Sequence, residues 1–208
     1  LWLDKDNSLW LGLFLKGALH YIPHLNRTVN YNLLSEEVSS GFCIIEDKND
    51  HVWYGGPSGL FLIDKKKINA RPEKVSPLRV FNLVQFNDSI LWAGTRKGSM
   101  FQINTRTLKV TSLPILPHTD LYVTYIYPDS HQRIWIGTDN NGLYVSDRNG
   151  SIIAFYSKEQ LGSNAIKGII EDEMSNIWVG TGNGLCCINP QTKNIDRYTT
   201  ADGLPSNQ

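Results

Sequence analysis

The stretch RIWIGTDNNGLYV, from Arg133 to Val145, places a tryptophan, two glycines and a threonine in fixed order between two apolar runs. Similar words occur near the start of the chain, as SLWLGLFLKGALH from Ser8 to His20, and near its end, as NIWVGTGNGLCCI from Asn176 to Ile188. Two looser versions lie between them. Because self-similarity at a fixed period is the signature of repeat architectures, the period must be measured before any single copy is interpreted as a site.

The repeat has five copies, and its landmark residues keep a nearly constant spacing. Successive tryptophans are separated by 43, 39, 43 and 43 residues, and a glycine follows each of them by two positions. These landmarks are Trp10, Trp53, Trp92, Trp135 and Trp178, with Gly12, Gly55, Gly94, Gly137 and Gly180. An aspartate precedes four of the tryptophans by six positions, at Asp4, Asp47, Asp129 and Asp172, whereas the third copy has Phe86 there. The same chemistry in successive copies indicates a structural repeat and not a catalytic site.

Each copy divides into four short strands separated by turns. In the fourth copy the strands are LYVTYIYP, QRIWIG, GLYVSD and SIIAFYS. They are apolar on both alternating sets of positions, so both faces of each sheet must be covered. Stacked four-stranded blades of about 40 to 45 residues cover both faces in a β-propeller. The sequence therefore predicts an all-β chain of five consecutive blades, at about residues 1–40, 41–77, 78–120, 121–163 and 164–208.

The landmark residues have physical roles in such a blade. We expect each tryptophan to fill space between neighbouring blades, and the glycine on the same face to leave room for a neighbour's side chain. The aspartate can accept hydrogen bonds from backbone amides of the following turn. Both ends of the sequence fall at nearly the same point of the repeat, so we expect an incomplete arc of a larger ring of about seven blades. The open blade faces of such an arc would be apolar patches that need a partner surface.

Composition limits the classes of partner and cofactor. Twenty basic residues balance twenty acidic ones, so no strong positive field is available for nucleic acid, and we expect Lys65–Lys67 to be a solvated run. No apolar stretch approaches the roughly 18 residues that cross a bilayer. The three cysteines have no CxxC spacing and the five histidines no metal-binding spacing. We therefore expect no disulfide framework, no metal and no cofactor.

Residues that differ between copies are the candidates for function, because loops on a rigid scaffold carry it. In a propeller the hairpins that join second to third strands share a face with the links between blades. Here that face carries cations, amides and aromatic rings, which suit a polar or anionic sugar. The predicted ligand-binding residues are Lys16, Arg79, Arg96, Lys97, His118, Tyr122, Asp139, Asn140 and Asn183, with Arg96 and Lys97 favoured. The alternative is that each is an ordinary solvated turn residue.

From Ile169 to Leu185 the sequence IIEDEMSNIWVGTGNGL, followed by INPQTKNIDRYTTADGLPSNQ, resembles the two-component regulator propeller repeat. The fourth and fifth copies resemble it closely and the first three loosely. The resemblance implies the periplasmic sensor region of hybrid two-component system histidine kinases, mostly of gut Bacteroidetes. Such a region has two propellers, each typically seven-bladed, and precedes a transmembrane helix, a kinase, a receiver and a DNA-binding domain.

The function implied by this resemblance is that of a non-catalytic periplasmic sensor segment of an inner-membrane protein. It would recognise a glycan-derived oligosaccharide and signal to a histidine kinase that controls transcription of glycan-utilisation genes. Its expected partners are the oligosaccharide, the rest of the same sensor region and a second copy in a homodimer. Two alternatives remain open. One is a propeller lyase or glycosidase, which needs a unique acid–base pair, and the other is a platform for protein interaction or dimerisation.

Overall fold

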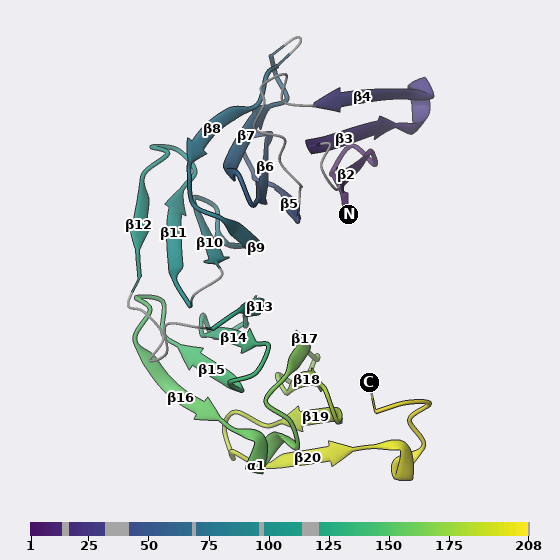
Figure 1. Ribbon diagram of the computed structural model, residues 1–208, viewed down its shortest axis with the longest axis vertical. Coiled ribbons are helices and arrows are strands. Elements are labelled where there is room, and N and C mark those ends of the chain that lie inside the picture. The colour runs from purple at the N-terminus through teal and green to yellow at the C-terminus, as the bar shows by residue number, and fades with distance from the viewer. Residues whose placement is uncertain (14–16, 32–41, 68–69, 96–97, 114–120, 208) are drawn as a thin grey trace. The chain divides into compact units, whose positions relative to one another are not determined.

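The computed structural model describes residues 1–13, 17–31, 42–67, 70–95, 98–113 and 121–207. These residues form five four-stranded antiparallel sheets, each built from four strands in chain order (Figure 1). The prediction of an all-β chain with five consecutive four-stranded blades is confirmed. The chain divides into two compact units, residues 1–95 with 101–111 and residues 96–100 with 112–208.

The first unit contains the first three blades. The first blade consists of β1 (Trp2–Leu3), β2 (Leu9–Leu13), β3 (Gly17–Ile22) and β4 (Arg27–Tyr31), with a 3-10 turn at Pro23–Leu25. The second consists of β5 (Cys43–Glu46), β6 (His51–Gly56), β7 (Gly59–Asp64) and β8 (Glu73–Ser76). The third consists of β9 (Val80–Asn87), β10 (Ile90–Thr95), β11 (Met100–Asn104) and β12 (Val110–Ser112).

The second unit contains the fourth and fifth blades. The fourth consists of β13 (Val123–Pro128), β14 (Ile134–Thr138), β15 (Leu143–Ser146) and β16 (Ile152–Tyr156). The fifth consists of β17 (Ile166–Glu171), β18 (Ile177–Thr181), β19 (Gly184–Ile188) and β20 (Ile195–Tyr198). The single-turn helix α1 (Lys158–Leu161) joins them, and a 3-10 turn at Thr200–Asp202 follows β20. Every repeat tryptophan lies on the second strand of its blade.

Blades stack with the tryptophan face of one against the opposite face of the next. In the first unit, Trp10 shares an apolar cluster with Val52 and Ile63 of the second blade. Trp53 shares another with Leu91 and Ile103 of the third. In the second unit the tryptophan of the fourth blade, Trp135, packs with fifth-blade residues Ile177, Val179 and Ile188. The cores therefore lie between blades, which explains why the strands are apolar on both faces.

Four of the five repeat tryptophans are among the largest fully buried side chains of the described residues. Trp10, Trp53, Trp92 and Trp135 are at most 1% exposed. Burying an aromatic side chain of this size contributes about 3 kcal/mol of apolar transfer free energy. The blades are consequently held together more by these rings than by any strand-to-strand hydrogen bond between blades.

The repeat aspartate makes a contact that the sequence analysis did not predict. Its Oδ2 accepts a hydrogen bond from the tryptophan Nε1 six residues later. The four Nε1–Oδ2 distances are 3.0 Å for Trp10–Asp4, 2.8 Å for Trp53–Asp47, 2.8 Å for Trp135–Asp129 and 2.9 Å for Trp178–Asp172. One carboxylate oxygen thereby satisfies an indole N–H that blade stacking removes from water.

The other carboxylate oxygen, Oδ1, shapes the turn between the first and second strands. It accepts from the backbone amides two and four residues later, as Asp47 does from Asn49 (2.7 Å) and His51 (3.1 Å). The residue three positions after each aspartate has a positive φ between 58° and 67°; these residues are Asn7, Asp50, Gln132 and Ser175. The aspartate thus fixes the turn and the indole together.

Candidate functional site

The hairpin between the second and third strands is fixed by the threonine of the repeat. Thr138 and Thr181 are at most 3% exposed. Thr138 Oγ1 donates to the Gly142 carbonyl (2.7 Å) and accepts from the Asn141 amide (2.9 Å). Thr181 Oγ1 donates to the Gly184 carbonyl at 3.0 Å in the same way. The side chains at the tips of these hairpins are therefore presented on an ordered backbone.

The described residues include five of the predicted ligand-binding residues. In the fourth blade the Asp139 amide donates to the Tyr122 carbonyl at 3.1 Å, which brings the hairpin beside the start of the blade. Tyr122, Asp139, Asn140 and Asn183 are exposed in the second unit, and Arg79 is exposed in the first. Lys16, Arg96, Lys97 and His118 lie outside the described residues.

The fifth blade has a polar corner around Gly162, which follows α1. A Cβ added to Gly162 would lie 3.6 Å from both the Asn183 Nδ2 and the Arg197 Nη1. The neighbouring Asn164 has a buried Oδ1 with no hydrogen-bond partner among the described residues. Sequence reasoning found Asn183 but missed Arg197, because Arg197 lies on β20 and not in a loop.

This polar corner brings the Asn183 amide and the Arg197 guanidinium to the same glycine. Amide and guanidinium groups donate to hydroxyl, carboxylate and sulfate oxygens. The exposed rings of Tyr122 (38%) and Tyr125 (38%) on the fourth blade of the same unit can contact apolar sugar faces. The arrangement can therefore bind a polar ligand, and it contains no paired carboxylates suited to acid–base chemistry.

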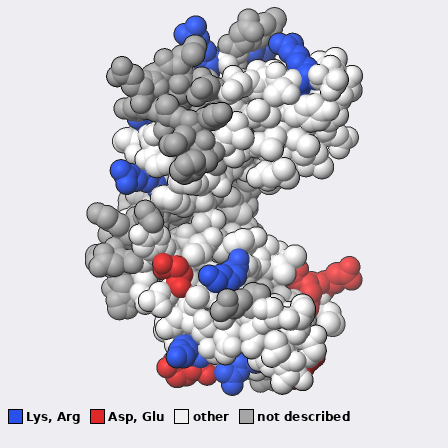
Figure 2. Space-filling model, turned by 45° about the vertical axis from the view of Figure 1, so that its right-hand side comes forward, with Lys and Arg blue, Asp and Glu red and all other residues white. Residues whose placement is uncertain are grey.

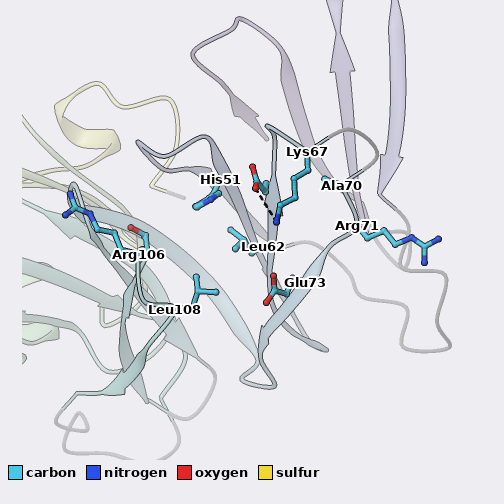
Figure 3. A pocket seen from close by; sticks show the side chains of 10 residues that line it. His51, Leu62, Lys67, Ala70, Arg71, Glu73, Arg106 and Leu108 are labelled. Atoms are coloured by element: carbon cyan, nitrogen blue, oxygen red, sulfur yellow. Dashed lines mark ion pairs between the residues drawn. The ribbon is translucent and has the colours of Figure 1, made fainter.

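Among the described residues, hollows lie at the outer edges of the blades, a location that the sequence did not suggest. Each lies between the outer strand of one blade and the last hairpin of the next. The hollow between the second and third blades measures about 230 Å³ (Figure 3). Its Lys67 pairs with Asp64 at 3.5 Å, and its two arginines, Arg71 and Arg106, extend in opposite directions. These arginines do not converge on one ligand.

A larger hollow lies beside the outer strands of the first blade and measures about 450 Å³. It is lined by His20, Arg27, Asn30, Tyr31 and Lys65, among others. A hollow of this size is within the range of small-molecule sites. It is a second place where a polar ligand could bind in the first unit.

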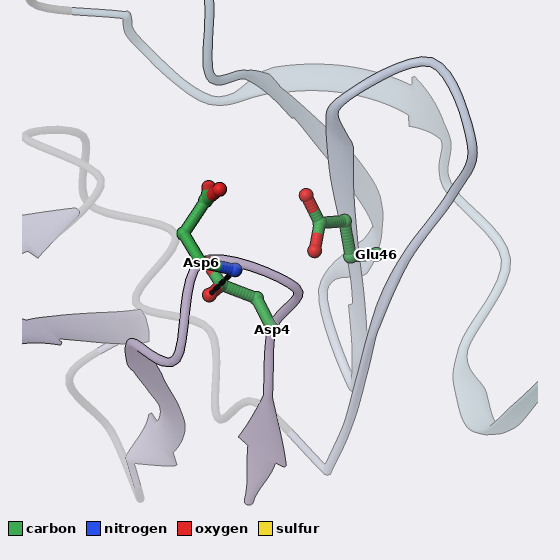
Figure 4. Close-up of side chains that lie close together, drawn as sticks. All are labelled: Asp4, Asp6 and Glu46. Carbon is green, nitrogen blue, oxygen red and sulfur yellow. Dashed lines mark hydrogen bonds between the residues drawn. The ribbon is translucent and has the colours of Figure 1, made fainter.

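A carboxylate cluster lies next to that hollow, between the first and second blades. Asp4, Asp6 and Glu46 each bring an oxygen within 4.8 Å of the others (Figure 4). The Lys65 Nζ occupies the middle of the group, 2.7 Å from Asp4, 2.7 Å from Asp6 and 3.0 Å from Glu46. The three carboxylates therefore bind an ammonium group of this chain. The expectation that Lys65 belongs to a solvated run was wrong, because its side chain is only 14% exposed.

The cluster shifts the ionisation of its members. Burial by itself raises the pKa of Asp4, but the Lys65 ammonium and the Ser8 and Trp10 donors outweigh it and hold the pKa far below its usual range. Burial lowers the pKa of Lys65, and the three carboxylates outweigh this and raise it. The pairs join the first blade to the second through charge as well as apolar packing.

A serine, a histidine and an aspartate meet in the first blade, which bears on the enzyme alternative. Ser8 Oγ donates to Asp4 Oδ2 at 2.7 Å and also contacts His20 Nε2 at 2.5 Å. In a nucleophilic triad the aspartate orients the far nitrogen of the histidine, whereas here both partners bond the hydroxyl. Ser8 is only 2% exposed, so a substrate could not reach its hydroxyl. This trio supports the blade and is not arranged for acyl transfer.

The sequence contains twenty basic and twenty acidic residues. On the face drawn in Figure 2, basic and acidic side chains are scattered among uncharged residues. Of the helices in the described part of the chain, none is long and apolar enough to cross a membrane.

Comparisons with known proteins confirm the repeat resemblance. The model of the family described as "Two component regulator propeller" matches residues 118–140. The chain is 27% identical to Histidine kinase P4 of Formosa agariphila across 99% of its own length, which corresponds to 20% of the kinase. The chain therefore spans about a fifth of that relative.

Solved structures share the fold. The extracellular domain assigned to a hybrid two component system, BT3049, of B. thetaiotaomicron superposes with a TM-score of 0.78 at 24% identity. The match covers 100% of this chain and 29% of that one, so the five blades correspond to part of a larger propeller domain. Virginiamycin B lyase from Staphylococcus aureus superposes with a TM-score of 0.72 at 17% identity, over 99% of this chain and 73% of the lyase. An enzyme thus shares this fold, and the fold alone does not decide between sensing and catalysis.

Proposed function

We propose that this chain is a non-catalytic segment of the extracytoplasmic sensor region of a hybrid two-component histidine kinase. The observation that carries the proposal is the similarity of 99% of the chain to a histidine kinase, together with the two-component regulator repeat at residues 118–140. The arrangement of Ser8, His20 and Asp4 favours sensing over hydrolysis, because the hydroxyl is buried and bonded to both partners. The location of such a region is the periplasm, with the whole protein anchored in the inner membrane.

The ligand that suits the polar corner is an oligosaccharide, and an anionic one most of all. Asn183 and Arg197 can donate to its hydroxyl and carboxylate or sulfate oxygens, and Asp139 and Asn140 can accept from its hydroxyls. Tyr122 can lie against a sugar ring. Arg79 and Lys16 of the first unit, and Arg96, Lys97 and His118 of the second, remain predicted ligand-binding residues, each within its own unit.

Isothermal titration calorimetry of the 208-residue chain against neutral and acidic oligosaccharides tests the ligand class. Asn183→Ala and Arg197→Ala are expected to weaken binding of an acidic oligosaccharide at least fivefold. Asn194→Ala is the matched control, because Asn194 is an exposed asparagine on the other hairpin of the same blade. Absence of binding across the panel by folded protein would contradict the proposal. Loss of binding on Arg27→Ala alone would instead locate the ligand in the hollow of the first blade.

Signalling across a membrane needs a change in how two subunits meet, so we further propose that the whole protein is a homodimer. Cross-linking of the complete sensor region, with and without the oligosaccharide that binds, tests this. A ligand-dependent change in cross-linked product is expected, and turnover of the oligosaccharide in the same mixture would favour the enzyme alternative.

A further inference from the structure

The strand position opposite the repeat tryptophan holds an unlike residue in the first blade. In the second, fourth and fifth blades the tryptophan pairs across the sheet with Leu62, Val145 and Cys187. In the first blade Trp10 pairs with His20, whose ring stacks on the indole with centroids 4.0 Å apart and planes 9° apart. The first blade therefore has an imidazole where these other blades have an aliphatic side chain or a thiol.

The hydrogen bonds of His20 determine which of its ring nitrogens is available. Burial lowers the pKa of His20 more than the Asp4 carboxylate raises it, so the imidazole is neutral at pH 7. The Ser8 hydroxyl donates its hydrogen to Asp4 at 2.7 Å, so it accepts from His20 Nε2 at their 2.5 Å contact. His20 Nδ1 then carries a lone pair, and no donor to it lies among the described residues. The available nitrogen is therefore a hydrogen-bond acceptor.

This imidazole lines the hollow of about 450 Å³ in the first unit, together with apolar and aromatic side chains. Val29 pairs with it across β3 and β4, and the Tyr31 ring stacks on Trp10 with centroids 5.2 Å apart. Ile22 and Ala70 add further apolar surface to the lining. A planar or cyclic ligand body can lie against such a wall.

Arg27 gives the hollow a cation that no carboxylate matches. It lies two residues before Val29, so its Cα is about 7 Å along β4 from the position opposite His20. The exposed guanidinium has no ion pair or hydrogen bond within the described part of the chain. Lys65 also lines the hollow, but three carboxylates already balance its ammonium. No acidic side chain is among the described lining residues, so the hollow favours an anion.

We propose that this hollow binds a small carboxylic acid whose planar or cyclic body carries a hydroxyl group at the end away from the carboxylate. The carboxylate pairs with Arg27, because a guanidinium can donate two parallel hydrogen bonds to it. The hydroxyl donates to His20 Nδ1, and the body lies against Val29 and Tyr31. The hollow and the polar corner of the fifth blade belong to different units, so this proposal does not depend on the oligosaccharide proposed above.

Isothermal titration calorimetry of the 208-residue chain at pH 7 tests the carboxylate contact, with 4-hydroxybenzoate as the probe. Arg27→Met is expected to weaken binding of the probe at least about tenfold, and Arg27→Lys is expected to weaken it less, because lysine keeps the charge but not the paired donors. Arg106→Met is the matched control, since Arg106 is an exposed arginine in the hollow between the second and third blades. It should leave binding unchanged.

The hydroxyl contact is tested with benzoate, which lacks the hydroxyl. The unchanged chain is expected to bind 4-hydroxybenzoate about fivefold more tightly than benzoate. His20→Phe keeps a ring on Trp10 but removes the acceptor, so it is expected to abolish this preference and to leave benzoate binding within about twofold. Near-UV circular dichroism establishes that each variant is folded, and the exposed position of Arg27 keeps the first test valid even where His20→Phe lowers stability.

Four results would overturn the proposal. They are no binding of the probe at millimolar concentration, equal weakening by Arg27→Met and Arg106→Met, a preference for the hydroxyl that survives in folded His20→Phe, and loss of probe binding on Arg197→Ala. The last result would place the probe in the polar corner. Failure of the oligosaccharide panel to bind, with the probe still bound, would instead contradict only the ligand proposed for that corner.

Discussion

The second and third blades are neighbours in one unit, yet they treat their tryptophans differently. Trp53 and Trp92 are both 0% exposed. Trp53 Nε1 donates to Asp47, whereas Trp92 Nε1 has no hydrogen-bond partner among the described residues. Phe86 takes the place of the aspartate, with its ring 6.1 Å from the Trp92 ring. Burial of the indole is therefore set by blade stacking, and the aspartate only makes that burial less costly.

The turns of these two blades differ for the same reason. In the second blade, Asp47 accepts two turn amides and Asp50 has a φ of 67°. In the third blade the strand pairing skips Phe86, and the Asn87 side chain accepts from the Ser89 amide at 3.0 Å. The residue at this position thus selects the local turn without changing the order of the strands.

Removing the Asp47 carboxylate should make the second blade resemble the third. Of the proposed substitutions, it should cause the largest loss of stability. Asp47→Ala leaves the Trp53 N–H and two turn amides without their acceptor, so the free energy of unfolding should fall by about 3 kcal/mol. Urea denaturation followed by tryptophan fluorescence measures it. Asp47→Asn is the conservative control and should lose less, because its side-chain oxygen can still accept from the amides. A loss below about 1 kcal/mol for Asp47→Ala would contradict the role given to this carboxylate.

Lys65→Met extends the comparison to the first blade, where Asp4 pairs with a lysine ammonium and not, as Asp47 does, with a histidine ring. Without the ammonium, the buried Asp4 and Glu46 carboxylates repel each other, and stability should fall by about 2 kcal/mol at pH 7. Lys67→Met is the matched control from the same lysine run, since Lys67 is 72% exposed and should change stability little. Equal effects of the two substitutions in urea denaturation would show that the cluster contributes nothing.

The acid dependence of the same variant gives an independent check. The pKa of Asp4 is lowered in the folded chain, so its contribution is fully present above the unfolded pKa of about 3.9 and is lost as pH falls below it. Without Lys65 the pKa of Asp4 is lowered less, so less stability is lost on acidification, and the difference in stability between Lys65→Met and the unchanged chain should shrink as pH falls. The midpoints of urea denaturation of the two chains, measured between about pH 3 and pH 7, test this expectation.

Transplanting the turn should make the third blade resemble the second. Replacing Phe86, Asn87, Asp88 and Ser89 by Asp, Lys, Asn and Asp, the sequence of residues 47–50, would provide an acceptor for Trp92 Nε1. The free energy of unfolding should rise by about 1 kcal/mol, because the stabilisation from the new hydrogen bond is partly offset by the loss of phenyl packing. The single change Phe86→Asp is the control and should gain less, since it keeps the bulged turn. No gain from the full transplant would mean that the Trp92 N–H is satisfied in another way.

The smallest effect is expected for the displaced aspartate of the third blade. Asp88 pairs with Lys48 of the second blade, and both side chains are more than 65% exposed. Asp88→Ala and Lys48→Ala should each change the free energy of unfolding by less than about 0.5 kcal/mol. A larger fall in the free energy of unfolding, measured by thermal denaturation, would show that this exposed ion pair stabilises the chain.

The sequence predicted the sheets because each blade repeats a few large constraints. A tryptophan at a spacing of about 43 residues and a glycine two positions later recur in every copy, so chance is excluded and the strand on which they lie follows. The bond from aspartate to indole could also have been predicted, because the six-residue spacing holds wherever the aspartate is present. Its absence from the third copy was visible in Phe86.

The remaining features were not predictable because they occur once. Lys65 looks like its neighbours Lys66 and Lys67 in the sequence, and only the fold brings it to Asp4, 61 residues away. Arg197 lies on an outer strand, where a cation is ordinarily solvated, and only the folded chain places it beside Asn183. Repeats reveal their shared core in the sequence, whereas a binding surface made of unlike residues appears only in three dimensions.

The direction of tryptophan packing has an evolutionary consequence. At the three junctions within the two units, each indole faces the blade that follows it in the chain. These head-to-tail interfaces between blades are all of one kind. Duplication or deletion of a whole repeat therefore leaves the residue types at every remaining interface unchanged. Gene duplication can therefore change the number of blades without any compensating substitution in the old ones.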